Sequence, residues 1–512
     1  MCIINTERKL LAAKVKIMKS KKLLSMSMIM ILAVLILLSS CTMEDVEYAG
    51  KVLEDVQSNG IGAISNITLP TVVITTPAPP SVEPDTTVPS TKKPPRVTTE
   101  VATTPQTTPV QIVNNDNFNP TVDYPKDGVI RTAEQLHAVL IDGASDANYA
   151  VTAAELDMEG LGWYGMEGFS GTFDFGNCVI KNASYPLFRS VKGATVKNLV
   201  IADSTYTRTD YEARIDDNPK TGESFNPYYS PVICYADGVI VSNVIIESSV
   251  SVKTDLWFNN TYHGGVVACA EGNVLISDCH FKGEFTSDSL LARFGGVAGH
   301  VQGIDENSIN REDLSKSTTL IVNCSNSGTI INLAYGNDSK TGGVIGSVSN
   351  AAILGCANYG DILNNDNGQS AGVVGYVGNA AYVKNCVNTA KVTGNQFVGG
   401  ICAYSNGDDR CFENCINIGV VKSSTRFVGG ILGSVRRTEK LINCFNLASA
   451  CDNFAYQYTY SASIDPSDAQ THFEITITNC ANLENINAIL ERINASAPGV
   501  FVKAANGLII LA

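Results

Sequence analysis

The chain has 512 residues, of which 44% are hydrophobic and 17% charged, and its formal net charge is −14. The first 40 residues hold seven Lys or Arg and one Glu, so the rest of the chain holds 29 basic and 49 acidic residues, a net charge of −20. Such an acidic chain is not expected to bind nucleic acid, which needs a basic surface to meet its phosphates. The length allows several ordinary domains or one large repeat domain.

The N-terminus has the pattern of an export signal with a lipid-attachment site. A basic stretch leads into the apolar run Leu23–Leu38, which is short for a transmembrane helix. The segment Leu38–Cys41 resembles the bacterial lipobox, and this resemblance implies that Cys41 receives a diacylglycerol thioether and becomes the mature N-terminus. Residues 1–40 are therefore predicted to be a lipoprotein signal peptide, with Met18 as an alternative start. A plain secretory signal is the competing interpretation.

Residues 41–127 are predicted to form a disordered stalk. The part from 66 to 109 contains 13 Thr and 10 Pro. Proline favours the polyproline II conformation, and too few large apolar side chains are left to form a core. We expect a semi-rigid spacer that spans up to about 130 Å when fully extended. The alternative is a disordered tail whose length has no role.

Two short sequence phrases recur from residue 128 onward. The first is an apolar residue, a spacer, Asn and then Cys or another apolar residue, and in six copies a second Asn follows two residues later. From Cys324 the intervals between copies are 32, 30, 29, 29 and 36 residues. The second phrase is Gly-Gly followed by Val or Ile. The residues expected to form columns are Cys324, Cys356, Cys386, Cys415, Cys444, Asn326, Asn358, Asn388, Asn417 and Asn446.

Stacked units of this kind predict an all-β, right-handed parallel β-helix over residues 128–512. Repeats are strongest over 264–482, a short helical lead-in precedes them, and residues 483–512 are expected to form a C-terminal cap of one helix and two strands. No proline occurs from 232 to 465, as expected for strands that pair on both sides. A propeller is disfavoured because it needs four strands in each unit of about 40–45 residues. The second Asn of each unit is expected to hydrogen-bond to the next coil.

The cysteines at the repeat position are expected to be packing thiols. Leu199 and Val244 occupy the same position in earlier coils, and free cysteine behaves as a small apolar residue. Disulfide bonds are the alternative in an exported protein. Cysteines stacked in register point their Cβ atoms in parallel, which suits a disulfide poorly. Pairing of Cys402 or Cys415 with Cys411 is left open.

These repeats resemble the GLUG-type repeat proteins of bacterial cell surfaces, which are related to pectin-lyase-like β-helices. The lead-in also matches, with a Thr-capped helix that begins at 131–136, then Trp163, the segment 169–177 and the phrase 180–182. The resemblance covers roughly 128 to 482. It implies the β-helix, and it does not point to one activity, because such repeats accompany adhesins, wall-associated proteins and peptidases.

No sequence motif for catalysis, metal binding or a cofactor stands out. The chain contains no zinc-protease, nucleophile-elbow, phosphate-loop or dinucleotide motif, and none of its five His lies beside a plausible nucleophile. The acidic pairs 216–217 and 408–409 lie in turn-like stretches, where Asp is favoured without any catalytic role. We therefore expect no cofactor and no metal, and an enzyme is the less favoured interpretation.

Three inserts between predicted strands carry aromatic side chains and are candidate ligand-binding loops. Flat rings stack on sugar faces, and hydroxyl and amide groups pair with sugar hydroxyls. The alternative is that these rings pack their own loops against the solenoid. The candidates are Tyr206, Tyr211, Tyr228, Tyr229, Trp257, Phe258, Tyr262, Tyr456, Tyr458 and Tyr460.

The sequence therefore predicts a non-catalytic surface protein that is held at the extracellular face of the cell membrane by its lipidated N-terminus. Its solenoid is expected to act as a monomer in adhesion or in binding of a glycan, a host protein or a wall protein. A polysaccharide lyase or glycoside hydrolase on a pectin-lyase-like β-helix is one alternative. A purely structural spacer is the other.

Overall fold

The computed structural model describes residues 124–512 except 210–226, 257–259, 290, 334–337, 365–367, 425–426, 437–438, 458–461 and 465–474. The chain divides into two units, 1–107 and 108–512, and every described residue belongs to the second. The predicted signal peptide, Cys41 and nearly all of the predicted stalk lie outside the described residues.

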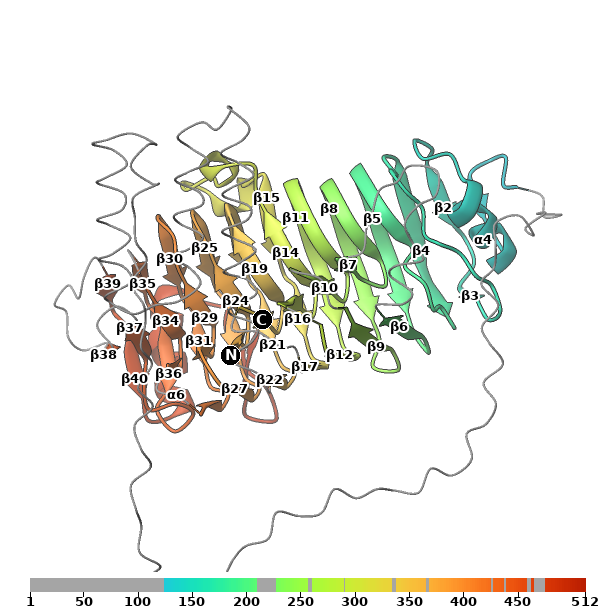
Figure 1. Ribbon diagram of the computed structural model, residues 1–512. Helices are drawn as coiled ribbons and strands as arrows, with labels where there is room; N and C mark the ends of the chain where they lie inside the picture. Colours follow the sequence, from blue (N-terminus) through green and yellow to red (C-terminus); the bar gives the residue numbers. More distant parts are fainter. Residues whose placement is uncertain are drawn as a thin grey trace, which may run out of the picture. The chain divides into compact units, whose positions relative to one another are not determined.

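The described part is a parallel β-helix, which confirms the predicted fold (Figure 1). Its coils stack strand on strand to form a 26-stranded sheet A and two 7-stranded sheets, B and C.

The strands of sheet A are β1 (Val129–Ile130), β2 (Tyr149–Val151), β3 (Glu155–Asp157), β4 (Thr172–Lys181), β5 (Phe188–Ile201), β8 (Ile233–Ile246), β11 (Val267–Phe281), β14 (Ala298–Gln302), β15 (Thr319–Val322), β16 (Ser325–Asn326), β19 (Ile345–Ser349), β20 (Ala351–Leu354), β21 (Ala357–Asn358), β24 (Val374–Val377), β25 (Ala381–Lys384), β26 (Val387–Asn388), β29 (Cys402–Ser405), β30 (Arg410–Glu413), β31 (Ile416–Asn417), β34 (Leu432–Val435), β35 (Glu439–Ile442), β36 (Phe445–Leu447), β37 (Ala455–Gln457), β38 (Ala462–Ile464), β39 (Ile475–Thr478) and β40 (Ala481–Leu483). Those of sheet B are β6 (Thr205–Thr209), β9 (Ser251–Asp255), β12 (Glu284–Ser287), β17 (Thr329–Asn332), β22 (Ile362–Asn364), β27 (Val392–Gly394) and β32 (Val421–Ser423). Those of sheet C are β7 (Tyr228–Tyr229), β10 (Tyr262–Gly264), β13 (Arg293–Gly295), β18 (Lys340–Gly342), β23 (Gln369–Ala371), β28 (Val398–Gly399) and β33 (Val428–Gly429).

A typical coil uses three strands of sheet A, one of sheet B and one of sheet C. The coil from β19 to β23 is an example, and β24 then pairs in parallel with β19 to start the next coil. Between β14 and β15 an insert carries the short helices η3 (Glu306–Ser308) and η4 (Leu314–Lys316). Apolar side chains from all three sheets point into one continuous core along the solenoid.

The second Asn of each repeat forms a ladder inside the solenoid. Nδ2 of Asn358 donates to Oδ1 of Asn388 in the next coil at 2.8 Å, and Nδ2 of Asn388 donates to Oδ1 of Asn417 at 2.8 Å. The same Nδ2 of Asn388 donates to the carbonyl of Ala390 at 3.0 Å. Each rung therefore joins two coils and also satisfies a turn carbonyl inside its own coil. The ladder runs through Asn326, Asn358, Asn388, Asn417, Asn446 and Asn482.

The first Asn of each repeat forms a second ladder near the surface. Asn443 donates to Oδ1 of Asn414 at 3.1 Å, and Asn414 donates to Oδ1 of Asn385 at 3.0 Å. All three have a φ between 51° and 57°, which Asn tolerates better than most residues. Asp278 and Gly355 replace Asn in two coils and have φ values of 53° and 58°, so this backbone requirement explains the substitutions.

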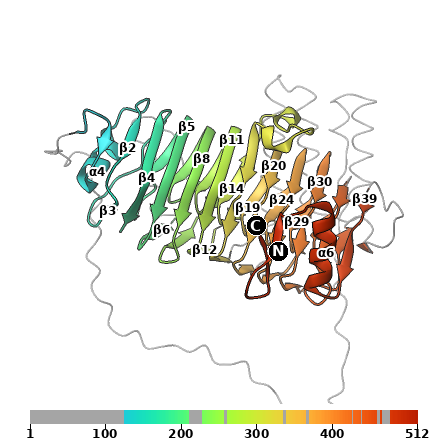
Figure 2. The same ribbon diagram turned by 180° about the vertical axis from the view of Figure 1, so that it is seen from behind.

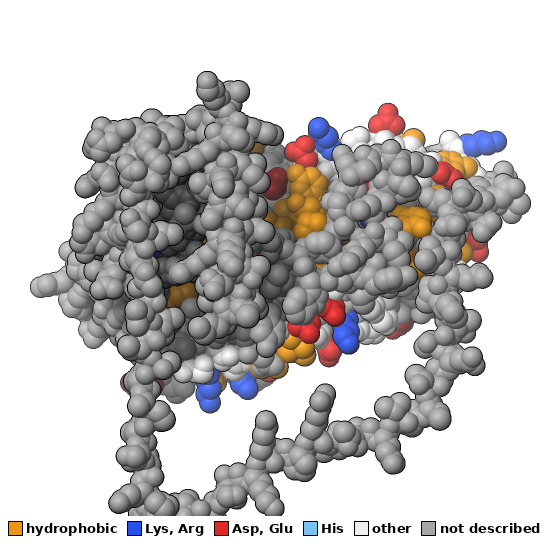
Figure 3. Space-filling model, viewed as in Figure 1, with side chains coloured by type: hydrophobic (Ala, Val, Ile, Leu, Met, Phe, Trp, Pro, Cys, Tyr) orange, Lys and Arg blue, Asp and Glu red, His pale blue; other side chains and the backbone are white. Residues whose placement is uncertain are grey.

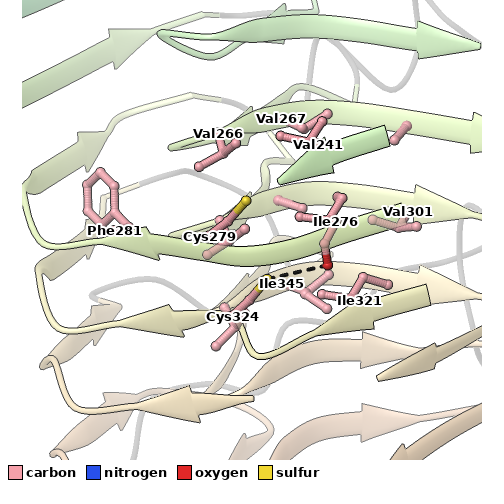
Figure 4. Packing of buried hydrophobic residues seen from close by; sticks show 14 of the residues in the cluster. Val241, Val266, Val267, Ile276, Cys279, Phe281, Val301, Ile321, Cys324 and Ile345 are labelled. Carbon is pink, nitrogen blue, oxygen red and sulfur yellow. Dashed lines mark hydrogen bonds between the residues drawn. The ribbon is translucent and has the colours of Figure 1, made fainter. Parts of the chain in front are cut away.

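The repeated cysteines form a buried column beside the inner Asn ladder. Figure 4 shows Cys279 and Cys324 in neighbouring coils, with the thiol of Cys324 donating to the carbonyl of Ile276 at 3.5 Å. All cysteines in the described part of the chain are free and buried. Burial raises the pKa of the Cys415 thiol, so it stays protonated. These thiols act as packing groups that also donate weak hydrogen bonds.

Both ends of the β-helix carry helical elements. Helix α4 (Ala133–Asp142) begins after Thr132, whose side chain accepts from the Gln135 amide, and it buries Leu136 against the first coils. Helix α6 (Ile486–Ser496) and the antiparallel pair β41 (Phe501–Lys503) and β42 (Ile509–Leu511) follow the last coil.

The C-terminal segment covers the side of the solenoid (Figure 2). It packs on an apolar column that successive coils present outward, and residues of that column include Val387, Ile416 and Phe445. Arg492 of α6 donates to Oδ1 of Asn479 at 2.8 Å, which supplies a donor for the last rung of the surface ladder. The predicted cap is therefore present and packs along the flank of several coils.

The inner ladder makes Asn388→Ala a sensitive test of coil stacking. This substitution removes the Asn388 side chain as a partner of Nδ2 of Asn358, of Oδ1 of Asn417 and of the carbonyl of Ala390. We expect a loss of roughly 2–4 kcal/mol in the free energy of unfolding. Denaturant titration followed by circular dichroism measures it. The control is Asn307→Ala, an exposed residue, which should change stability by less than about 0.5 kcal/mol. Equal effects from both variants would contradict a structural role for the ladder.

Candidate ligand-binding strip

Two columns of outward side chains meet where sheet C turns into sheet A. The registers of sheet C stack Tyr228, Tyr262, Arg293, Lys340 and Gln369 in successive coils. Phe397 and Phe427 immediately precede Val398 and Val428, which pair in register after that point, and so continue the column. The sheet A column consists of Tyr235, Cys269, His300, Ser347, Tyr376, Tyr404 and Ser434. We call the two columns together the strip.

The repeated Gly-Gly turn brings these columns together. A Cβ atom on Gly342 would lie 2.0 Å from the carbonyl oxygen of Ile345, so the turn from β18 to β19 admits only a very small residue. A Cβ on Gly346 would lie 2.4 Å from the backbone nitrogen of Phe294. Sheet C therefore packs closely on this part of sheet A. The residues that directly precede the sheet A column are all small, namely Cys234, Ala268, Gly299, Gly346, Gly375, Ala403 and Gly433.

Aromatic rings contact one another along both ends of the strip. At one end the ring of Tyr228 lies 5.3 Å from that of Tyr235 and 5.1 Å from that of Tyr262. At the other end Phe397 stacks on Tyr404 with 4.9 Å between ring centroids. Contacts of this kind fix ring orientation, because ring edges and faces carry opposite partial charges. The strip therefore presents rings that are already ordered and, at the tyrosines, partly exposed.

Two cations occupy the middle of the strip. The guanidinium of Arg293 lies 4.9 Å from the ring centre of Tyr262, and its Nη1 donates to the Tyr262 hydroxyl at 2.7 Å. In the next coil the ammonium of Lys340 lies 5.2 Å from the ring centre of Tyr376. Lys340 also pairs with Asp338 at 2.9 Å. On the face seen in Figure 3, hydrophobic patches lie next to acidic and basic side chains.

The histidine and cysteine of the strip are not arranged as an activated nucleophile and base. His300 shares a 2.7 Å hydrogen bond with Ser347, but burial lowers the pKa of His300 to about 3, which makes it a weak base at neutral pH. Burial also raises the pKa of Cys269, opposite to the shift that creates a reactive thiolate. Another His–Ser contact, between His280 and Ser325 at 2.8 Å, joins successive coils elsewhere. Coil-to-coil hydrogen bonding accounts for both pairs.

A charged pair lies inside the solenoid near its C-terminal end. Arg410 and Glu439 are both fully buried and their side chains approach to 3.3 Å. Ser405 donates to the same carboxylate at 2.7 Å. In the two preceding coils the position of Arg410 is occupied by Ala381 and Ala351, so those coils have no charge there. Burial raises the pKa of Glu439 to about 7, and Arg410 and Ser405 oppose that shift.

The structure separates the aromatic candidates into three groups. Tyr228 and Tyr262 are partly exposed and belong to the strip. Tyr206, Tyr229 and Tyr456 are buried, at 0%, 2% and 3% exposure, so packing rather than ligand contact accounts for their position. Tyr206 and Tyr229 lie in strands, as Tyr456 does, and not in free loops. Tyr211, Trp257, Phe258, Tyr458 and Tyr460 lie outside the described residues.

In the acidic pair 408–409, the carboxylate of Asp409 contacts two neighbouring side chains. Asp409 forms an ion pair with Arg311 of the η3–η4 insert at 2.5 Å and accepts from the hydroxyl of Tyr382 at 3.1 Å. It therefore fastens the insert to later coils. The pair 216–217 lies outside the described residues. Within the described ranges, no three His, Cys, Asp or Glu side chains converge as a metal site would require, and no helix is long and apolar enough to cross a membrane.

Sequence reasoning missed most of the strip, although a signal was present. In the phrase that begins with Gly342-Gly343, the residue two positions before the first Gly is Lys340 and the residue five positions after it is Ser347. The same two offsets give Tyr262 and Cys269 around Gly264, and Phe397 and Tyr404 around Gly399. Applied to every copy of the phrase, these offsets identify both columns from Tyr262 and Cys269 onward.

These features define the protein as a parallel β-helix solenoid with an outward aromatic and cationic strip. No protein-family model and no curated protein sequence matches the chain. One solved structure, from Bacteroides ovatus and named "putative immunoglobulin A1 protease", aligns over 75% of this chain and 91% of its own with 17% identity and a TM-score of 0.33. At that identity and TM-score the likeness assigns no activity to this chain.

The buried pair predicts a specific dependence of stability on pH. The pKa of Glu439 is higher in the folded chain, about 7, than its usual 4.5, so the folded state holds this proton more tightly. This tighter binding of the proton stabilises the folded state. The stabilisation is complete below about pH 4.5 and is lost as the pH rises through about 7. The difference in unfolding free energy between wild type and Glu439→Gln should therefore fall across this range. Denaturant titrations at several pH values measure it, and a constant difference would contradict the assignment.

Proposed function

We propose that the protein is a lipid-anchored bacterial surface solenoid that binds a glycan through the strip. The observation that carries this proposal is the pair of ordered, partly exposed aromatic clusters at the two ends of the strip, of which Tyr228, Tyr262 and Tyr376 are members. Rings on a rigid scaffold can stack on sugars at little entropic cost, because their side chains are already held by neighbours. The lead-in and repeats that resemble GLUG-type surface proteins support a place at the cell surface.

The spacing of the strip suits an extended polymer. Equivalent side chains in neighbouring coils are separated by one strand spacing, about 4.8 Å. A chain molecule that runs parallel to the solenoid axis would therefore meet a strip residue at each coil. Hydroxyl groups beside the rings add polar contacts. A binding role also fits the weak basicity of His300 and the raised pKa of Cys269, neither of which favours bond cleavage.

The proposed anchor rests on the N-terminal sequence alone. The segment Leu38–Cys41 resembles a lipobox, and a diacylglycerol group on Cys41 would hold the protein at the membrane surface without a spanning helix. The Thr- and Pro-rich stalk would then separate the solenoid from the membrane. In this proposal the solenoid lies on the extracellular face of the cell membrane.

The anchor predicts that Cys41→Ala abolishes lipid attachment. Thiol chemistry is needed to form the thioether, so the variant should incorporate no radiolabelled fatty acid and should leave the membrane fraction. Labelling of cells that express the full chain, followed by fractionation, measures both effects. Cys178→Ala, at a buried cysteine of the solenoid, is the matched control and should label normally. Unchanged labelling of the Cys41 variant would refute the anchor.

Glycan binding predicts a loss on removal of a ring from the strip. Tyr376→Ala should weaken binding at least about tenfold, equivalent to about 1.4 kcal/mol, because the ring offers a stacking surface. Tyr185→Ala removes an exposed ring outside the strip and should have little effect. Binding of the full chain to a glycan panel and release of reducing ends are measured together. Equal binding by both variants would argue against the strip, and release of sugar ends would show an enzyme.

A further inference from the structure

We infer that the middle of the strip is a subsite for carboxylate groups, so that the ligand is an acidic glycan. This inference rests on the proposed glycan binding and names the class of glycan. The carboxylate would lie at Arg293 and Lys340, and the sugar rings on either side of it would lie against the rings of Tyr262 and Tyr376.

The geometry of Arg293 supports a carboxylate ligand. A guanidinium has five N–H donors in a planar fork, and it can bind a carboxylate through two parallel hydrogen bonds. Its Nη1 donates to the Tyr262 hydroxyl, and the cation also lies over that ring. Both contacts hold the guanidinium in one orientation. Within the described residues Arg293 has no ion pair, and its side chain is partly exposed.

The charges that face this region leave Arg293 uncompensated. Lys340 lies one coil further along the same column, so two cations are stacked without an acidic residue between them. Asp338 neutralises Lys340 and is itself 61% exposed, which leaves it free to exchange partners with solvent ions. Glu271, the other nearby carboxylate, accepts from the hydroxyl of Tyr235 at 3.1 Å.

Burial makes the charged form of Lys340 less stable, and a bound anion would offset this cost. Its side chain is only 7% exposed, and burial lowers the pKa of the ammonium. Asp338 opposes that shift, and Arg293 adds to it. A carboxylate bound between the two cations would offset both the lost hydration and their mutual repulsion.

The two ends of the strip differ from its middle. The first end presents Tyr228 and Tyr235, and the other presents Tyr404, whose ring stacks on the buried ring of Phe397; all four are uncharged. An acidic glycan that lies along the strip would therefore place a carboxylate at the centre and sugar faces at both ends. A fully neutral glycan would dehydrate the guanidinium of Arg293 without giving it a carboxylate partner, which costs free energy.

The test compares acidic polymers with their carboxyl-reduced forms. The full chain is titrated with alginate and hyaluronan, each also in carboxyl-reduced form, and with dextran as a neutral polymer. Wild type should bind at least one native acidic polymer at least about tenfold more tightly than its reduced form. Arg293→Gln should remove most of that preference, whereas Arg293→Lys should retain part of it. Lys253→Gln, which removes one exposed cation from sheet B, is the matched control.

The possible results separate this inference from the proposed function. Equal binding of native and reduced polymers by wild type would overturn the acidic subsite while leaving glycan binding intact. So would an equal loss in Arg293→Gln and Lys253→Gln, which would show a non-specific charge effect. Absence of binding to every polymer, together with no effect of Tyr376→Ala, would overturn glycan binding itself. The wild-type comparison needs no variant, so it decides the question even if Arg293→Gln is unstable.

Discussion

The close contact between the inner Asn ladder and the Gly-Gly turns determines how each coil closes. A Cβ atom on Gly343 would lie 2.3 Å from Oδ1 of Asn358 and 2.1 Å from the carbonyl of Gly372 in the next coil. Only glycine fits between the ladder and the neighbouring coil. Because the turn is this tight, sheet C is pressed against sheet A and the two outward columns of the strip come into contact. The strip is thus a consequence of the same contact that closes the core.

The two Asn ladders run in opposite directions, and this has a physical consequence. In the inner ladder Asn388 donates forward to Asn417, whereas in the surface ladder Asn443 donates backward to Asn414. Hydrogen-bonded amides in one direction polarise one another, and their dipoles add along the column. Opposed ladders let the dipoles offset each other across the coil. The solenoid therefore gains two sets of coil-to-coil bonds without a large net dipole along its axis.

The features that repeat in sequence were predictable, and those that break the repeat were not. The Asn and Cys columns follow from a period near 30 residues, since equivalent positions in a β-helix must stack. The strip was harder to predict because the residue type at each strip position changes from coil to coil, from Cys269 to His300 to Ser347, although the positions themselves are constant. The emphasis on aromatic inserts instead selected Tyr206, which the structure buries in a strand. The internal Arg410–Glu439 pair was unpredictable, because charged residues are ordinarily placed outside.

In this fold, the positions that close the coils differ from the positions that form the strip. In the coils from β15 onward, the inner ladder, the Cys column and the second glycine of each turn use one residue type each, because each occupies a space that neighbouring coils define. Strip positions face outward, so Tyr228 can be followed by Tyr262 and then Arg293 without a change in backbone geometry. A single substitution at a partly exposed strip position such as Tyr262 therefore leaves the Gly-Gly turn and the inner ladder in place. Under the proposed function, ligand preference would then be set coil by coil along the axis, and selectivity would depend on the order of rings and cations in the strip.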